Sequence, residues 1–170
     1  MVILGPGAIC LRTAKLFLAF GADVIAYSRS RRPEAGAMGI RYLPLEDLMA
    51  ESDIVSVHVP SNGETRHLIS REQIARMKPT AILINAARGA VVDNAALAEA
   101  LNAGRLAAAG IDVFDMEPPL PASDPLLQAK NAVLAPHIGF LTDESMLRRA
   151  ETVFANIDAF LRGAPENLVK

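Results

Sequence analysis

The sequence predicts an α/β fold: a Rossmann-type, doubly wound parallel sheet covered by helices on both faces, in three αβα layers. Short apolar runs alternate with helical patterns along the whole chain, which is typical of βαβ units. A glycine-rich turn joins the first apolar run to the first helical pattern. The residues are 51% hydrophobic but only 5% aromatic, so small aliphatic side chains must pack the helices closely onto the sheet.

Apolar runs with the length of buried parallel strands recur along the chain. In chain order they cover residues 2–4, 24–27, 40–43, 54–59, 81–84, 110–113 and 132–134. A helix at 8–20 follows the glycine turn. A second is expected at 93–104, since Asp93 suits a helix N-cap and Gly104 a helix end. A third covers 142–161, where apolar residues recur at helical spacing before Gly163.

The bulk properties exclude several classes of protein. A net charge of −2 argues against a nucleic-acid partner. No stretch approaches the roughly 18 apolar residues of a membrane helix and no basic leader opens the chain, so we expect no membrane association. Cys10 is the single cysteine and has no neighbours at metal-ligand spacing, which argues against a disulfide or a metal site. A reducing cytoplasm suits this composition.

The glycine-rich turn predicts a dinucleotide site. Gly5 and Gly7 follow an apolar strand and precede a helix, where glycines allow a tight turn and let the backbone approach a pyrophosphate. Cys10 stands where a third glycine would be usual, so either helix and strand are farther apart or the thiol packs between them. The alternative is a glycine turn before a helix without any ligand.

The loop after the second strand bears on which cofactor binds. An NAD-specific enzyme would place an acid there, on the adenosine ribose, but this chain has Ser28 and Arg29, followed by more Ser and Arg. Guanidinium and hydroxyl groups bind a ribose phosphate through charge-assisted hydrogen bonds. We therefore expect NADP in preference to NAD, with NAD possible. The alternative is a solvated basic loop.

Three further strand ends carry an arginine, a glutamate and a histidine. Arg88 follows the run that ends at 84, Glu117 follows the run at 110–113, and His137 follows the run at 132–134. Open α/β sheets bind their ligands at the carboxyl ends of the strands. An arginine placed there suits a carboxylate ligand.

These segments resemble the D-isomer-specific 2-hydroxyacid dehydrogenases. The resemblance rests on Asn-Ala-Ala-Arg-Gly at 85–89, on Asp-Val-Phe-x-x-Glu-Pro at 112–118 and on Pro-His-Ile-Gly at 136–139. The segments at 52–60 and 64–69 agree, and the match runs from Met1 to about Asn167. A short-chain reductase or a methyltransferase is set aside, because no matching Tyr-x-x-x-Lys pair or acidic-loop pattern occurs.

The resemblance implies catalytic roles for the three strand-end residues. Arg88 would orient the substrate carboxylate and carbonyl, while His137 would protonate the carbonyl oxygen as hydride arrives. Glu117 would pair with the imidazole and favour its protonated form. Taken singly, a lone histidine is more often structural, and a glutamate before prolines can merely cap a turn. The same resemblance implies that the cofactor is lined by Ala8, Ile9, Val59, Pro60, Ala86, Asp112 and Gly139.

The domain organisation follows from the resemblance. We expect a dinucleotide-binding domain at 1–163 and an exit tail at 164–170 toward a separate substrate domain that these residues do not include. The complete enzyme would transfer hydride between NAD(P)H and a small 2-oxo acid, with glyoxylate or hydroxypyruvate preferred, and would form a homodimer through this domain. Little or no turnover is expected from this chain alone. The alternative is a truncated, non-catalytic module for nucleotide binding or dimerisation.

Overall fold

The computed structural model describes residues 2–5, 7–116 and 119–168, and it divides into two compact units. The first unit covers residues 1–137 and contains the sheet. The second covers residues 138–170 and contains the last helix.

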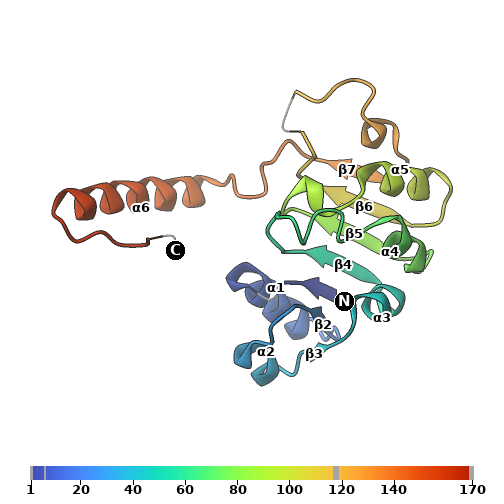
Figure 1. The fold of residues 1–170 in the computed structure, drawn as a ribbon, viewed down its shortest axis with the longest axis horizontal. Helices are drawn as coiled ribbons and strands as arrows, with labels where there is room; N and C mark the ends of the chain where they lie inside the picture. The colour runs from blue at the N-terminus through green and yellow to red at the C-terminus, as the bar shows by residue number, and fades with distance from the viewer. Residues whose placement is uncertain (1, 6, 117–118, 169–170) are drawn as a thin grey trace. The chain divides into compact units, whose positions relative to one another are not determined.

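The first unit is built on a single sheet whose strand pairs are all parallel (Figure 1). The strand order is β3-β2-β1-β4-β5-β6-β7, so the chain winds outward in one direction from β1 and in the other from β4. This order confirms the predicted doubly wound fold. The strands are β1 (Val2–Leu4), β2 (Ile25–Tyr27), β3 (Arg41–Tyr42), β4 (Ile54–Val57), β5 (Ile82–Asn85), β6 (Ala108–Ile111) and β7 (Ala132–Leu134).

Two strands differ from the prediction by more than one residue at an end. β6 begins at Ala108 and ends at Ile111, two residues before the predicted positions at both ends, because Ala108 pairs with Ile82 and sets the register. Alanine is a weak strand former, which explains why the pattern placed the start at Gly110. β4 ends at Val57, so the residues at 58 and 59 belong to the loop that follows.

The helices of the first unit are mostly short. They are α1 (Ala8–Ala19), α2 (Pro33–Ala37), α3 (Leu45–Glu51), α4 (Arg71–Arg76) and α5 (Asn94–Asn102), with 3₁₀ turns η1 (Gly89–Val91) and η2 (Pro125–Gln128). The predicted cap of α5 is confirmed, because Asp93 Oδ1 accepts a hydrogen bond of 2.9 Å from the Ala96 N–H. Gly104 follows α5 with a φ of +66°, as expected of a helix end.

Helices cover both faces of the sheet, as the three-layer prediction requires. Neighbouring residues of a strand point to opposite faces, and Ile25 and Ala26 of β2 belong to two different buried clusters. The larger cluster packs α3, α4 and α5 against β4 and β5. The smaller one packs α1 and α2 against β2.

Cys10 belongs to the smaller cluster, where it packs with Ala14, Val24 and Ala26. Its side chain is 2% exposed, so the thiol fills the layer between α1 and the sheet at the position where a third glycine was expected. Burial raises the pKa of the Cys10 thiol to about 12. The thiol is therefore a packing group and not a nucleophile.

This environment predicts that Cys10 resists alkylation in the folded chain. With a pKa of about 12, the thiolate fraction at pH 8 is roughly a thousandfold below that of an ordinary cysteine. Iodoacetamide labelling followed by mass spectrometry should be at least about a hundredfold slower in buffer than in urea, since burial and the raised pKa act together. Equal labelling rates in the two conditions would contradict the buried position.

The second unit contains the long helix α6 (Asp143–Leu161), which confirms the predicted third helix. Thr142 and Ser145 form a reciprocal capping box, with hydrogen bonds of 3.1 and 3.2 Å. Before the helix, the Phe140 ring lies 5.5 Å from the Arg149 guanidinium. No helix among the described residues is long and apolar enough to cross a membrane. The domain boundary at residue 163 stays a prediction.

Candidate functional site

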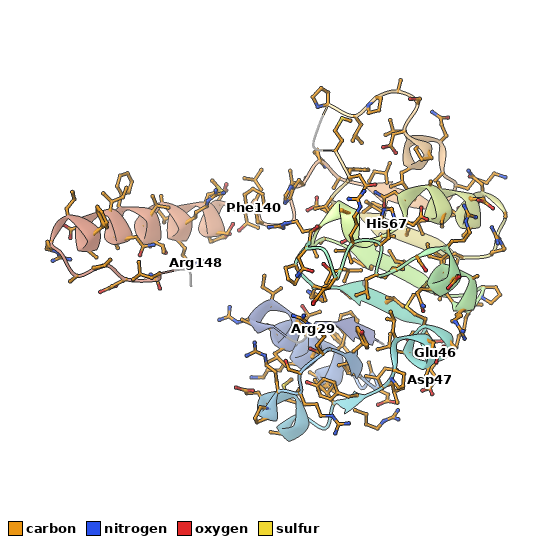
Figure 2. The ribbon with its side chains drawn as sticks, in the orientation of Figure 1. Arg29, Glu46, Asp47, His67, Phe140 and Arg148 are labelled. Carbon is orange, nitrogen blue, oxygen red and sulfur yellow. The ribbon has the colours of Figure 1, made fainter. Side chains whose placement is uncertain are left out.

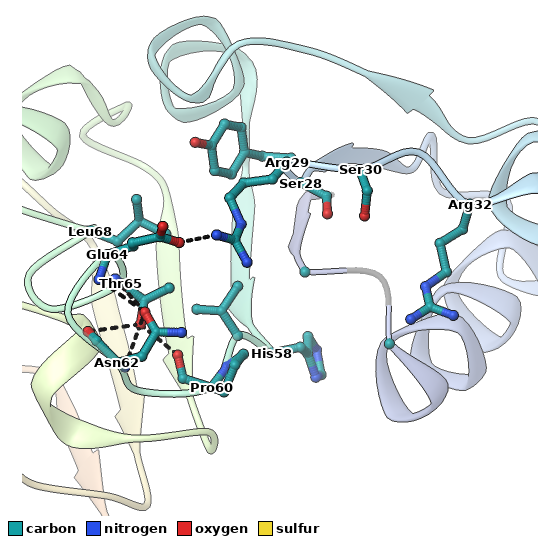
Figure 3. Close-up of a pocket in the computed structure, with 14 residues that line it drawn as sticks. Ser28, Arg29, Ser30, Arg32, His58, Pro60, Asn62, Glu64, Thr65 and Leu68 are labelled. Carbon is teal, nitrogen blue, oxygen red and sulfur yellow. Dashed lines mark hydrogen bonds and ion pairs between the residues drawn. The ribbon is translucent and has the colours of Figure 1, made fainter. Parts of the chain in front are cut away.

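A cavity of about 310 Å³ opens at the carboxyl ends of β1, β2 and β4 (Figure 3). β1 and β4 are the central strands from which the chain winds in opposite directions, and ligands of open α/β sheets bind at this position. Six residues predicted to contact a cofactor line the cavity together: Gly5, Gly7, Ser28, Arg29, Val59 and Pro60.

Gly5 and Gly7 are glycines for different structural reasons. Gly5 has a φ of +82°, and a Cβ there would lie 2.6 Å from Val59 Cγ1. It also donates a backbone hydrogen bond of 3.0 Å to Tyr27, which joins the turn to the end of β2. Gly7 has an ordinary extended conformation, and a Cβ there would meet no heavy atom within 4 Å. Gly5 is therefore needed by the fold, whereas Gly7 keeps a space open.

That open space fits a pyrophosphate. Gly7 is the N-cap residue of α1, and no described side chain caps the helix there. The N–H groups of the first helical turn are thus available to an anion, whose charge the helix dipole also stabilises. Ala8 and Ile9 lie in this turn and are exposed, with Ile9 74% accessible. A dinucleotide phosphate group therefore matches the geometry of this turn.

The loop after β2 carries the basic residues of the cavity. Arg29 and Arg32 both line it, but in Figure 3 they point in different directions. Arg29 forms an ion pair with Glu64 on the opposite wall. Arg31 instead lies over the ring of Tyr42, 5.8 Å from its centre, and the Tyr42 hydroxyl accepts a hydrogen bond of 3.1 Å from the Arg32 N–H.

The wall opposite Arg29 is the loop after β4, in which Pro60 was a predicted cofactor contact but Asn62, Glu64 and Thr65 were not. Asn62 Oδ1 accepts hydrogen bonds from the N–H groups of Glu64 (2.9 Å) and Thr65 (3.1 Å). The Thr65 hydroxyl donates to the Pro60 carbonyl at 2.6 Å and accepts from the Asn62 N–H at 2.8 Å. An Asn-Gly pair such as that at 62–63 is typical of a turn, but no local pattern encodes that this loop faces Arg29.

His58 directly follows β4 and lines the cavity. Its Nε2 is 2.9 Å from the hydroxyl of Ser56, and burial lowers the pKa of the imidazole. The ring is therefore neutral at pH 7 and acts as a wall of the cavity. His67 lies outside the cavity, in a turn with a φ of +48°, and its N–H donates to the Ala90 carbonyl at 2.8 Å (Figure 2).

Arg88 follows β5 in a turn that the Asn85 side chain holds together. Asn85 is fully buried; its Nδ2 donates to the Arg88 carbonyl at 3.0 Å, and its Oδ1 accepts from the Ala87 N–H at 3.1 Å. Arg88 is exposed, and its Nη1 donates a hydrogen bond of 2.6 Å to the Ala87 carbonyl. Asn85 was part of the recognised Asn-Ala-Ala-Arg-Gly segment, but its role as the support of the turn could be seen only in the structure.

Gly89 fixes this turn against the loop after β6. A Cβ at Gly89 would lie 1.9 Å from the carbonyl carbon of Phe114 and 2.5 Å from the backbone nitrogen of Asp115. Only glycine allows two backbones to approach so closely. The turn carrying Arg88 and the loop that follows Asp112 are thus packed directly on each other.

The register of the sheet brings the remaining strand ends to the same edge. Asn85 pairs with Ile111 and Ile111 with Leu134, so the segments after β5, β6 and β7 leave the sheet at one level. Asp112 is half-buried directly after β6, with its N–H donating to the Asn85 carbonyl at 2.9 Å. His137 is half-buried three residues after β7, with a φ of +59°.

Some predicted site residues stay outside this arrangement. Glu117 lies outside the described residues. Gly139 belongs to the second unit, so its role stays a prediction. Ala86 and Asp112 lie at the ends of β5 and β6 and do not line the cavity. Six of the predicted cofactor contacts thus lie together at the ends of β1, β2 and β4. The predicted contacts Ala86 and Asp112 and the predicted catalytic residues Arg88 and His137 follow β5, β6 and β7.

Comparison with known proteins gives a consistent set of relatives. The chain is 49% identical over 169 residues to a glyoxylate reductase of Aeropyrum pernix, covering 98% of the chain and 50% of that protein. It is 46% identical over 170 residues to the glyoxylate/hydroxypyruvate reductase B of Serratia proteamaculans, covering 98% and 52%. The chain therefore spans about half the length of these relatives.

A solved structure of a 2-hydroxyacid dehydrogenase has a similar fold. The D-lactate dehydrogenase of Aquifex aeolicus, in complex with NAD and lactic acid, superimposes with a TM-score of 0.88 at 36% identity, covering 96% of this chain and 53% of that one. The model of the NAD binding domain of D-isomer specific 2-hydroxyacid dehydrogenases matches residues 1–139. The strand order, the glycine turn and these matches agree, and the chain belongs to the D-isomer specific 2-hydroxyacid dehydrogenase family.

Proposed function

We propose that this chain binds a nicotinamide dinucleotide, NADP in preference to NAD, and carries the catalytic side chains of a 2-hydroxyacid dehydrogenase. The observation that carries the proposal is the row of strand ends at one edge of the sheet. A cavity with an open glycine turn lies at the ends of β1, β2 and β4, and Arg88, Asp112 and His137 follow β5, β6 and β7. A bound cofactor would supply or accept the hydride. The substrate proposed is a small 2-oxo acid, with glyoxylate or hydroxypyruvate preferred.

The proposed roles of the side chains follow from their chemistry. Arg88 is exposed, and the guanidinium N–H groups that do not bond the Ala87 carbonyl are suited to hold a substrate carboxylate through hydrogen bonds. His137 would donate a proton to the carbonyl oxygen during reduction and accept it back during oxidation. Glu117 would stabilise the protonated imidazole. Asp112 would hold the amide of the nicotinamide ring.

Water must be excluded for these charges to act strongly, and the relatives are about twice as long as this chain. We propose that a second domain of the complete enzyme closes over Arg88 and His137 and that this chain alone has little turnover. The family resemblance also supports a homodimer through the cofactor domain. The buried, unpaired Cys10 fits a reducing, cytoplasmic location.

The preference for NADP rests on Ser28 and Arg29, which stand where an NAD-specific enzyme would place an acid. Replacing Arg29 with Ala should weaken NADPH binding about tenfold, the effect of losing a charge-assisted hydrogen bond to the 2′-phosphate. NADH binding should stay within about twofold, because NADH lacks that phosphate. Calorimetric titration of the unmodified chain and of Arg29→Ala with NADPH and with NADH, at fixed salt, measures the change in affinity for each cofactor.

The matched control is Arg41→Ala. Arg41 is also an exposed arginine in an ion pair, at 3.1 Å from Asp23, but it does not line the cavity. It should leave both affinities unchanged. Equal weakening of NADPH and NADH by Arg29→Ala would mean that the basic loop does not contact the 2′-phosphate.

A further inference from the structure

We propose that Glu64 determines how strongly the chain discriminates between NADPH and NADH, by competing with the 2′-phosphate of NADPH for the guanidinium of Arg29. The inference rests on the proposed function, since it assumes that the cavity at β1, β2 and β4 receives the adenosine half of the cofactor. The loop after β4, which carries Glu64, would then contribute to cofactor specificity.

The geometry places an anion where a phosphate is expected to bind. Arg29 projects from the end of β2 across the mouth of the cavity, and its guanidinium is ion-paired with the carboxylate of Glu64 on the far wall (Figure 3). Both side chains are mostly exposed, at 75% and 67%. An exposed pair is weak enough to exchange partners when a ligand arrives.

The loop that carries Glu64 keeps the carboxylate at this position. Asn62 and Thr65 tie the loop through four hydrogen bonds of 2.6 to 3.1 Å, one of them from the Glu64 N–H itself. The backbone of Glu64 is therefore fixed, and only its side chain can turn away. Competition for Arg29 is thus a property of the folded loop.

The two cofactors meet this pair differently. A 2′-phosphate needs the same guanidinium donors that Glu64 occupies, and it must either displace the carboxylate or share the cation with a second anion. NADH has hydroxyl groups at the same position, which can donate to a carboxylate, as they do to the acid of NAD-specific folds. Glu64 therefore weakens NADPH binding and leaves NADH binding unharmed.

Arg32 explains why NADPH remains the preferred cofactor. It lines the same cavity, points away from Glu64, and forms no ion pair with any residue that the structure describes (Figure 3). Of the two arginines that line the cavity, Arg29 is thus engaged by Glu64, and Arg32 can attract the phosphate. Removing the charge of Glu64 should make Arg29 available to the phosphate as well.

The test is calorimetric titration of the chain and of Glu64→Gln with 2′,5′-ADP, 5′-AMP, NADPH and NADH at low salt. We expect Glu64→Gln to bind 2′,5′-ADP and NADPH about three- to fivefold more tightly, the size expected for relief of an exposed ion pair. The affinities for 5′-AMP and NADH should stay equal or fall slightly. The gain should shrink as salt rises.

Two further variants identify the cause. Glu46→Gln removes the same charge from another exposed pair, Glu46 of α3 with Arg76 of α4 at 3.2 Å. Neither residue lines the cavity, so this variant should leave all four affinities unchanged. Combining Glu64→Gln with Arg29→Ala should abolish most of the gain, because no guanidinium remains to be released. An equal gain in the Arg29→Ala background would overturn the competition for Arg29.

The outcomes also separate this inference from the function on which it rests. If the unmodified chain binds neither cofactor, both are overturned. If it binds NADPH and NADH but Glu64→Gln strengthens both or neither, the cofactor site stands and the role of Glu64 is overturned.

Discussion

Gly7→Val is expected to reduce the affinity for both NADPH and NADH at least about a hundredfold while leaving the chain folded. Gly7 has a φ of −80°, which valine adopts, and its Cβ would enter open space. That space adjoins the first turn of α1, where the proposed pyrophosphate binds. The added side chain would occupy the position of the phosphates and shield the N–H groups of the turn. Calorimetric titration measures the loss.

Stability measurements distinguish a blocked site from an unfolded chain in Gly7→Val. The free energy of unfolding should change by about 1 kcal/mol or less, because no described side chain caps α1 at Gly7 and no neighbour is displaced. Gly36→Val is the matched control, since a Cβ at Gly36 also meets nothing within 4 Å but lies in α2, outside the cavity lining. It should bind both cofactors normally. Normal binding by Gly7→Val would contradict the proposed phosphate position.

Gly89→Ala is expected to destabilise the chain by roughly 3 kcal/mol or more, or to prevent folding. The new Cβ would lie 1.9 Å from the carbonyl carbon and 2.0 Å from the carbonyl oxygen of Phe114. These are backbone atoms, and the Phe114 side chain is only 6% exposed, so no flexible group can move aside cheaply. Urea unfolding followed by circular dichroism measures the change.

In the matched control, the same substitution at another glycine is expected to leave the free energy of unfolding unchanged or to raise it. Gly36→Ala adds the same methyl group inside helix α2 in open space, and it should leave stability unchanged or raise it by up to about 1 kcal/mol. A Gly89→Ala variant as stable as the unmodified chain would show that the Arg88 turn does not pack on the loop after β6. The proposed alignment of Arg88 and Asp112 would then lose its structural basis.

The fold was predictable wherever a pattern extends over several residues. The seven strands and α1, α5 and α6 have apolar periodicity or clear caps, such as Asp93 before α5. α2, α3 and α4 have only five to seven residues, too few for a helical period to be distinguished from chance. β6 was misplaced because pairing with Ile82, and not the propensity of its alanines, sets where it begins.

The part of the site formed by residues that directly follow the strands could be predicted from the sequence. Gly5, Ser28 and Val59 meet because parallel strands bring their carboxyl ends to one edge of the sheet. The contact between Arg29 and Glu64 joins residues 35 positions apart through two loops, and no local pattern encodes such a contact. Asn85 was visible as a motif residue, but its two hydrogen bonds depend on the path of the turn after β5.

A crystal structure of the chain with NADPH would show where the cofactor binds. We expect the pyrophosphate beside Gly7 at the start of α1 and the 2′-phosphate between Ser28 and Arg29, in the cavity of about 310 Å³. A nucleotide bound elsewhere, for example in the cavity of about 270 Å³ that Arg71 and Arg105 line between α4 and α5, would contradict it. So would crystals grown at saturating NADPH whose cavity at β1, β2 and β4 contains no nucleotide.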